Sequence, residues 1–115
     1  MDTTKPVGIK NNLYPVFLKL EELRVLLVGA GNVGLEKLHS LLANSPNTAV
    51  TIVAPIVKEE VRRLAWKHSS CEIVQKPFEA TDLENKDLVI LATDDRKLHE
   101  EVRILAKAKG LLVNV

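Results

Sequence analysis

A short apolar run that leads into three closely spaced glycines constrains the fold of this chain more than any other feature. Residues 25–28 are aliphatic throughout, which is typical of a strand that helices cover on both sides of a parallel sheet. Gly29, Gly31 and Gly34 follow at the spacing G-x-G-x-x-G, and helical periodicity resumes after them. The first glycine of such a pattern permits a tight turn, the second lets backbone approach a pyrophosphate, and the third lets helix pack closely on strand. The stretch therefore predicts a strand, a phosphate-binding loop and a helix.

The expected helix N-terminus is itself an anion site. Its first backbone N–H groups lack partners within the helix and carry a partial positive charge, so a diphosphate can be held without lysine or arginine. Glycines also mark ordinary turns, but here a strand precedes them and a helix follows, as the motif requires. We expect a dinucleotide-binding loop, with a purely structural turn as the alternative.

Composition excludes several classes of function. The 115 residues suit one domain and are few for a complete two-domain enzyme. A formal net charge of +1 gives no electrostatic case for binding nucleic acid or an anionic membrane. No apolar stretch approaches the roughly 20 residues that span a bilayer, and the N-terminus lacks a signal-peptide core, so we expect a cytoplasmic protein. Cys71 is the sole cysteine, so an intrachain disulfide is impossible, and without a second thiol we do not expect a zinc site.

Strand and helix patterns alternate along the chain. We expect a flexible leader over residues 1–12 and a leader strand over 13–20. Further strands are expected at 24–28, 49–54, 71–75, 87–93 and 111–115, with helices near 32–43, 58–68 and 96–109. This alternation predicts an α/β fold, a Rossmann-type doubly wound sheet of about five parallel strands in the order 3-2-1-4-5, plus the leader strand. Residues 13–115 would form one domain. Because the last strand coincides with the last residue, we expect a piece of a longer protein.

Candidate ligand-binding residues follow the second and fourth strands as well as the first. The carboxyl ends of parallel strands meet at one edge, where such sheets bind ligands. The second strand ends in Ala54-Pro55-Ile56, where many dinucleotide sites have an acidic residue for the ribose, so no side chain here selects NAD or NADP. Backbone groups of Pro55 and Ile56 can frame the ribose or adenine instead.

The residues after the fourth strand offer side chains to the same edge. Thr93 can hydrogen-bond a ribose or phosphate, whereas Asp94 and Asp95 can contact a ligand or cap the next helix. Adjacent carboxylates in an extended chain point apart, which disfavours a metal site.

Other side chains have a structural interpretation. We expect Val33 in the apolar stripe of the first helix and Trp66 to pack against the core or a loop. Phe78 and Leu83 would close the bottom of the core. His39 and His99 are expected on the outer faces of their helices.

Several segments of the chain together resemble the N-terminal dehydrogenase domain of siroheme synthase, the precorrin-2 dehydrogenase family. The resemblance lies in residues 14–20 (Tyr-Pro-Val-Phe-Leu-Lys-Leu), 28–34, 53–55, 77–78, 92–95 (Ala-Thr-Asp-Asp) and 113–115. These segments span almost the whole chain. The leader segment, the missing ribose acid and the Ala-Thr-Asp-Asp turn are atypical of generic dehydrogenases, so the combination is more specific than the glycine loop.

This resemblance implies NAD-dependent oxidation of precorrin-2 to sirohydrochlorin, a step toward siroheme that some members couple to iron insertion. It implies cofactor contacts at Gly29, Gly31, Asn32, Val33, Pro55, Ile56 and Thr93. The glycine pattern adds Gly34 to these candidates, and the turn after the fourth strand adds Asp94. Family members usually have alanine or another small residue at the position of Gly34, a departure that should not block binding. The family's catalytic aspartate would follow Val115, together with the dimerisation segment and the helical part that completes the tetrapyrrole cleft. We therefore expect NAD binding without turnover by this chain, and a homodimer at full length.

A non-enzymatic NAD(H)-sensing domain is the second interpretation. The regulatory modules of potassium-uptake systems are also single Rossmann units of about this size. They typically begin at the glycine strand and keep the ribose acid, and neither feature is present here. In the full gene, an aspartate after Asn114-Val115 and a helical tail would favour the enzyme, and a transporter neighbour would favour the sensor.

Overall fold

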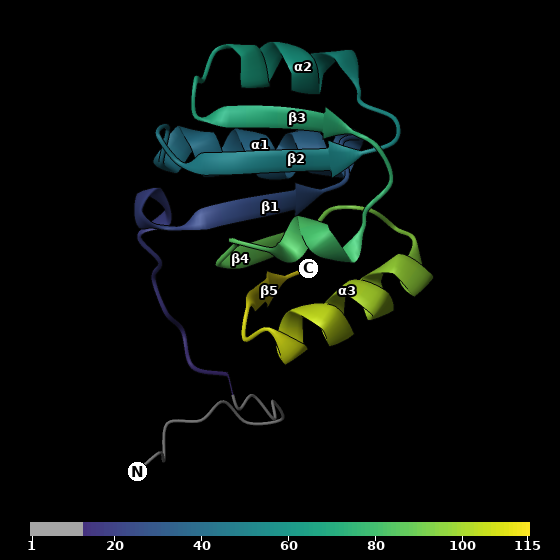
Figure 1. Cartoon of the computed structure of the whole chain (residues 1–115). Helices are drawn as coiled ribbons and strands as arrows, with labels where there is room; N and C mark the ends of the chain where they lie inside the picture. The colour runs from purple at the N-terminus through teal and green to yellow at the C-terminus, as the bar shows by residue number, and fades with distance from the viewer. Residues whose placement is uncertain (1–12) are drawn as a thin grey trace, which may run out of the picture.

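Five parallel strands form one sheet in the order β3-β2-β1-β4-β5 (Figure 1). The computed structural model describes residues 13–115, and the leader expected over residues 1–12 lies outside this part. The predicted Rossmann-type sheet and its strand order are confirmed. The elements, in chain order, are η1 (Leu20–Glu22), β1 (Arg24–Val28), α1 (Asn32–Asn44), β2 (Ala49–Ala54), α2 (Glu59–Trp66), β3 (Cys71–Gln75), η2 (Ala80–Leu83), β4 (Leu88–Leu91), α3 (Arg96–Ala108) and β5 (Leu112–Asn114).

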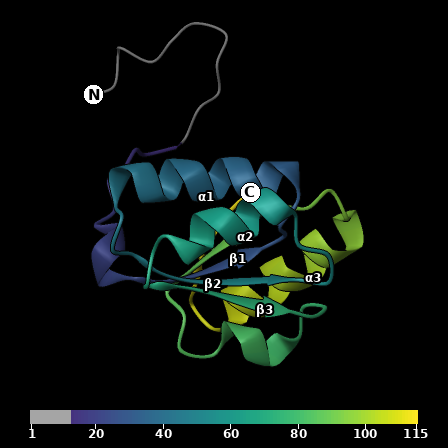
Figure 2. The same ribbon diagram turned by 90° about the horizontal axis from the view of Figure 1, so that it is seen from above.

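Helices cover both faces of this sheet (Figure 2). α1 and α2 pack on one face, where the core includes Val25 and Leu27. α3 and η2 pack on the other, where the core includes Leu26 and Val28. Neighbouring residues of a strand point to opposite faces, so β1 contributes to both cores. This double burial explains why the strand has no polar face.

The register of the central strands sets the position of the loops that follow them. Val28, the last residue of β1, lies opposite Val53 of β2 and Leu91 of β4. At the opposite, amino ends of the strands, Arg24 and Asp87 link the start of β1 to the start of β4. The Arg24 amide donates to Asp87 Oδ2 at 2.8 Å, and the Asp87 amide donates to the Arg24 carbonyl at 2.8 Å. The loops after β1, β2 and β4 consequently emerge side by side.

The prediction of a leader strand over residues 13–20 is wrong. Residues 13–19 have no regular structure, and η1 follows them. β1 already has β2 on one side and β4 on the other, so it has no free edge with which the segment just upstream could pair. Pro15 also lacks the N–H that a strand ladder uses. Figure 1 shows this purple segment running away from the sheet, and Tyr14 and Phe17 are exposed.

Two side chains expected to be buried lie at the surface. Trp66 is 89% exposed and Val33 is 50% exposed. α2 buries Val61 and Ala65 against the sheet, and consecutive helical residues are separated by about 100° around the axis. Trp66, one residue after Ala65, therefore points to solvent. Val33 lies in the first turn of α1, at the open edge of the sheet.

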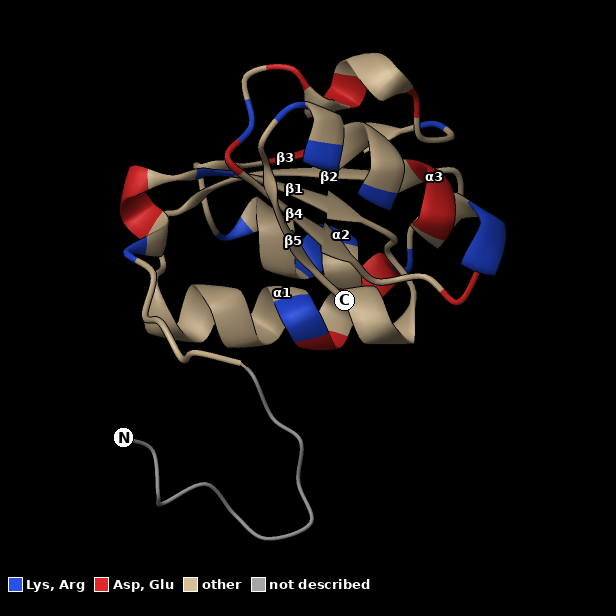
Figure 3. Ribbon diagram, turned by 90° about the horizontal axis from the view of Figure 1, so that it is seen from below, with Lys and Arg blue, Asp and Glu red and all other residues tan. Residues whose placement is uncertain are grey.

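Charges of both signs are interspersed over the helices (Figure 3). On α2, Arg63 pairs with Glu59 at 3.7 Å, and at its N-terminus Lys58 pairs with Glu60 at 3.8 Å. Exposed ion pairs of this kind are typical of a solvated helix face. Within residues 13–115, no helix has both the length and the apolar character needed to cross a membrane.

Candidate cofactor-binding site

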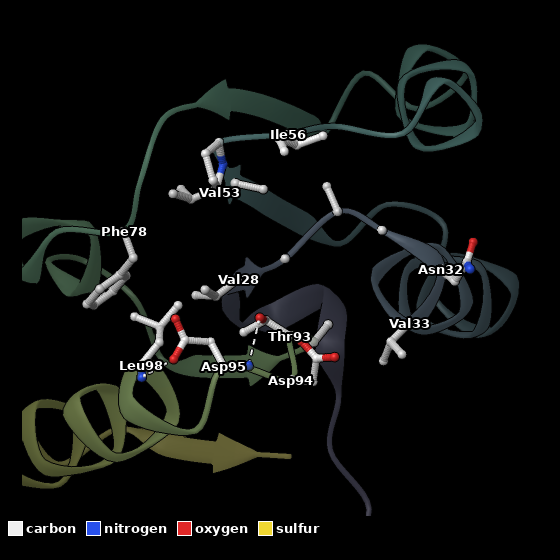
Figure 4. Close-up of a pocket in the computed structure, with 16 residues that line it drawn as sticks. Val28, Asn32, Val33, Val53, Ile56, Phe78, Thr93, Asp94, Asp95 and Leu98 are labelled. Atoms are coloured by element: carbon white, nitrogen blue, oxygen red, sulfur yellow. Dashed lines mark hydrogen bonds between the residues drawn. The ribbon is translucent and has the colours of Figure 1, made fainter.

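A cavity of about 510 Å³ opens at the carboxyl edge of the sheet, where β1, β2 and β4 end (Figure 4). This volume lies within the usual range for small-molecule and cofactor sites. The candidate residues that line it are Gly29, Gly31, Asn32, Val33, Pro55, Ile56, Thr93 and Asp94. The fold thus brings together three segments that are far apart in the sequence. Gly34, the remaining candidate, is not part of the lining.

Gly29 makes the tight turn out of β1. Its φ is +114°, and a Cβ at this position would lie 2.4 Å from the carbonyl oxygen of Ala92. Its amide donates to the Val53 carbonyl at 3.0 Å, while the Ala92 amide donates to the Val28 carbonyl at 2.8 Å. The turn is therefore fastened to both neighbouring strands, with no room for a side chain.

Gly31 has the opposite environment. A Cβ there would meet no atom within 4 Å, so the space beside its backbone is open to a ligand. Gly31 is also the N-cap of α1, and no side chain caps the helix. The first amides of α1 accordingly keep their hydrogen-bonding capacity and their partial positive charge. Together these features form an anion cradle beside the cavity.

Gly34 serves packing and lies apart from the cavity. It is buried, and a Cβ there would lie 2.5 Å from the carbonyl oxygen of Gly29. This close approach of α1 to the end of β1 is the role expected of the third glycine in the pattern. An alanine at this position would need the Gly29 carbonyl to shift.

Backbone groups dominate the rim beyond β2. Ala54, Pro55 and Ile56 supply no carboxylate, and the Ile56 side chain is 81% exposed. Gln75 Nε2 donates to the Pro55 carbonyl at 3.1 Å, which fixes the loop from the end of β3. The Lys58 amide donates to the Ala30 carbonyl at 2.9 Å and ties this segment to the glycine loop.

The turn between β4 and α3 supplies the third wall. Asp95 caps α3, since its Oδ1 accepts a hydrogen bond from the Leu98 amide at 3.1 Å. Thr93 Oγ1 accepts from the Asp95 amide at 3.2 Å. Asp94 does not cap the helix and lies at the cavity. His99 was expected on the outer face of α3. Instead it is half-buried, and its Nε2 is hydrogen-bonded to the Thr93 carbonyl.

Phe78, which was expected to close the core, lines the cavity together with Leu98. Leu83 is buried as expected. Phe78 is partly buried and packs against the same core cluster, and it also reaches the cavity from the segment after β3. Figure 4 shows Phe78 and Leu98 at one end of the cavity and Asn32 and Val33 at the other. The Pro77-Phe78 pair in the family resemblance was the only sequence feature that could have indicated a place for Phe78 at the cavity.

Metal-binding groups do not gather in this part of the chain. Among residues 13–115, no three His, Cys, Asp or Glu side chains are placed to hold a metal ion together. Cys71 lies at the start of β3, away from the cavity, and burial raises the pKa of its thiol. The cavity therefore offers hydrogen bonds and a helix N-terminus as its binding chemistry.

Siroheme synthases are among the known proteins that the chain matches. The enzyme of Pseudoalteromonas atlantica is 39% identical over 102 residues, which are 89% of this chain and 21% of that protein. The enzyme of Methylococcus capsulatus is 41% identical over 101 residues, which are 88% of this chain and 21% of that protein. The chain thus spans about a fifth of the length of these relatives.

Solved structures that share its fold include two dehydrogenases. SirC, precorrin-2 dehydrogenase, superposes with a TM-score of 0.76 at 29% identity, covering 90% of this chain and 49% of that chain. Saccharopine dehydrogenase from Saccharomyces cerevisiae gives a TM-score of 0.55 at 22% identity, over 79% of this chain and 21% of that chain, a likeness of fold alone.

A family model described as "Putative NAD(P)-binding" matches residues 16–115, nearly the whole of the described chain. The matched span contains the glycine loop and the walls of the cavity. The similarity to siroheme synthase and precorrin-2 dehydrogenase noted in the sequence is confirmed by the relatives and the structure above. The chain belongs to this NAD(P)-binding family.

Proposed function

We propose that residues 13–115 form the NAD-binding domain of a dehydrogenase that oxidises precorrin-2 to sirohydrochlorin in siroheme biosynthesis. One observation carries the cofactor half of this proposal. Three loops converge on a single cavity beside an uncapped helix N-terminus and an open glycine. The similarity to siroheme synthases and to SirC supports the substrate half.

The residues present fit a nicotinamide dinucleotide. A pyrophosphate needs backbone donors that it can approach closely, and the amides at the start of α1 beside Gly31 supply them. The backbone around Pro55 and Ile56 would frame the adenosine ribose. Thr93 and Asp94 would contact the cofactor from the β4 side. The end of β2 bears no carboxylate, so the preference for NAD over NADP rests on the family resemblance.

The contribution of this domain to the reaction is binding and orientation. When bound there, NAD⁺ would supply the two-electron acceptor that oxidation of the macrocycle requires. The glycine loop and the helix N-terminus would hold the diphosphate. The loops after β2 and β4 would fix the two sides of the nucleotide and so determine where its reactive ring lies.

For the full-length protein, the resemblance supports four finer proposals. The protein would be a cytoplasmic homodimer, a carboxylate outside residues 13–115 would assist proton removal from precorrin-2, and the same protein could insert iron into the product.

Isothermal titration of the chain with NAD⁺ and with NADP⁺ tests the cofactor half. A Gly31→Asp variant places a carboxylate where the pyrophosphate would lie, and the open space at Gly31 leaves the fold room for it. Ser40→Asp, on the exposed face of the same helix, is the charge-matched control. We expect NAD⁺ binding by the wild type and the control and at least a tenfold loss in Gly31→Asp. Failure of the wild type to bind either nucleotide, or equal binding by Gly31→Asp, would contradict the proposal.

The substrate half is tested on the full-length protein. Precorrin-2 is incubated with NAD⁺, and formation of sirohydrochlorin and NADH is followed by absorbance. Turnover that depends on NAD⁺ supports the dehydrogenase. Nucleotide binding with no oxidation of precorrin-2 would favour the NAD(H)-sensing alternative.

A further inference from the structure

We infer that His99 is a positioning residue for cofactor binding, acting through Thr93. It would hold the turn between β4 and α3 so that the Thr93 hydroxyl donates a hydrogen bond to the bound nucleotide. The inference rests on the proposed function, because it names a residue that supports the NAD site without lining it.

The first observation is the contact between the His99 ring and the Thr93 backbone. His99 is the fourth residue of α3 and is half-buried, and its Nε2 is hydrogen-bonded to the Thr93 carbonyl oxygen. A carbonyl oxygen can only accept, so Nε2 carries the hydrogen. A side chain of α3 therefore holds the backbone of Thr93, in the turn that follows β4.

The second observation concerns the Thr93 hydroxyl. Its oxygen accepts the Asp95 amide hydrogen at 3.2 Å, as the dashed line in Figure 4 marks. A hydroxyl has one hydrogen to donate in addition to its acceptor lone pairs. Because the Asp95 contact uses a lone pair, the hydroxyl hydrogen is free to point into the cavity that Thr93 lines. With its carbonyl held by His99 and its hydroxyl held by Asp95, Thr93 is fixed in the orientation that this donation needs.

Helix capping does not account for His99. Asp95 already caps α3 through the Leu98 amide, and the Thr93 carbonyl lies outside the helix. Loss of the His99 ring should therefore loosen the turn at the cavity more than it unfolds α3.

Titration calorimetry with NAD⁺ tests this on the full chain. His99→Leu keeps an apolar side chain of similar bulk and removes the donor. We expect its Kd to rise about fivefold, the effect of one lost hydrogen bond of ordinary strength. His99→Gln places an amide Nε2 at a similar reach and should restore most of the affinity. His39→Leu, on the exposed face of α1, is the matched histidine control and should bind as the wild type does.

A double-mutant cycle shows whether His99 acts through Thr93. In a Thr93→Val background the hydroxyl is absent, so His99→Leu should cause no further loss of affinity. A loss of the same factor in both backgrounds would overturn the inference. Val102→Ala removes buried volume from α3 at a residue that does not line the cavity. If it weakens NAD⁺ binding as much as His99→Leu does, a general loosening of the helix explains the effect and the inference fails.

The proposed function and this inference fail in different ways. A wild-type chain that binds neither NAD⁺ nor NADP⁺ refutes the proposed function and removes the basis of the inference with it. A wild type that binds NAD⁺ with the same affinity as His99→Leu leaves the proposed function standing and refutes the role of His99 alone.

Discussion

Replacing Gly29 by alanine should destabilise the fold far more than replacing Gly31, although both glycines belong to the same loop. At Gly29 the backbone has a φ of +114°, and the new Cβ would lie 2.4 Å from the Ala92 carbonyl oxygen. That oxygen belongs to backbone at the buried end of β4, so it cannot move aside cheaply. At Gly31 the φ is −94° and the Cβ would have no neighbour within 4 Å.

The expected magnitudes differ severalfold. The disfavoured φ costs about 1–3 kcal/mol, and relief of the clash requires the β4 backbone to shift, so we expect Gly29→Ala to cost about 3–5 kcal/mol in total. For a domain of this size each kcal/mol lowers Tm by roughly 4–8 °C, so Tm should fall by about 15 °C or more. Gly31→Ala loses only the preference for glycine over alanine at a helix N-cap, about 1 kcal/mol or less.

Thermal unfolding followed by circular dichroism, with urea unfolding at 25 °C, measures both variants against the wild type. If Gly29→Ala and Gly31→Ala unfold within a few degrees of each other, the close approach of Gly29 to Ala92 does not exist in solution. The assignment of distinct roles to the two glycines would then be wrong.

Two further predictions concern the surface. Hydrogen bonds from Arg24 hold the pKa of Asp87 below its ordinary value of 3.8, so the ionised carboxylate favours the folded state. This contribution is complete above pH 3.8 and is lost as the pH falls through the lower folded-state pKa. In urea unfolding, the stability difference between the wild type and Asp87→Asn should therefore be constant from pH 7 to 5 and shrink below about pH 4; a difference unchanged at pH 2 would contradict this. Trp66→Ser should change the free energy of unfolding by no more than about 0.5 kcal/mol, because the side chain is 89% exposed; a loss above about 2 kcal/mol would show that Trp66 packs against the core after all.

Local pattern was sufficient for the sheet and for the edge at which the cavity lies. Residues 25–28 are apolar because β1 is buried on both faces, and that property is visible in the sequence without knowing the neighbours. The alternation of strands and helices implied a parallel sheet, since parallel strands need crossover connections. The glycine loop pointed to a Rossmann-type unit, whose order is β3-β2-β1-β4-β5. That order places the loops after β1, β2 and β4 side by side, so the candidate residues in these loops could be named before any contact was known.

Tertiary structure decided which side chains those loops present and what holds them. Residues 14–20 look like a strand by composition, yet β1 has no free edge to receive one. Trp66 looks like a core residue, yet Val61 and Ala65 already fill the buried face of α2. The contact between His99 and the Thr93 carbonyl and the reach of Phe78 into the cavity depend on how helix and loop cross the sheet edge. A sequence pattern reports periodicity along one element, whereas burial and contact depend on the space that the other elements leave. That is why the sequence alone located the candidate binding edge, and only the folded chain showed how Thr93 is held there.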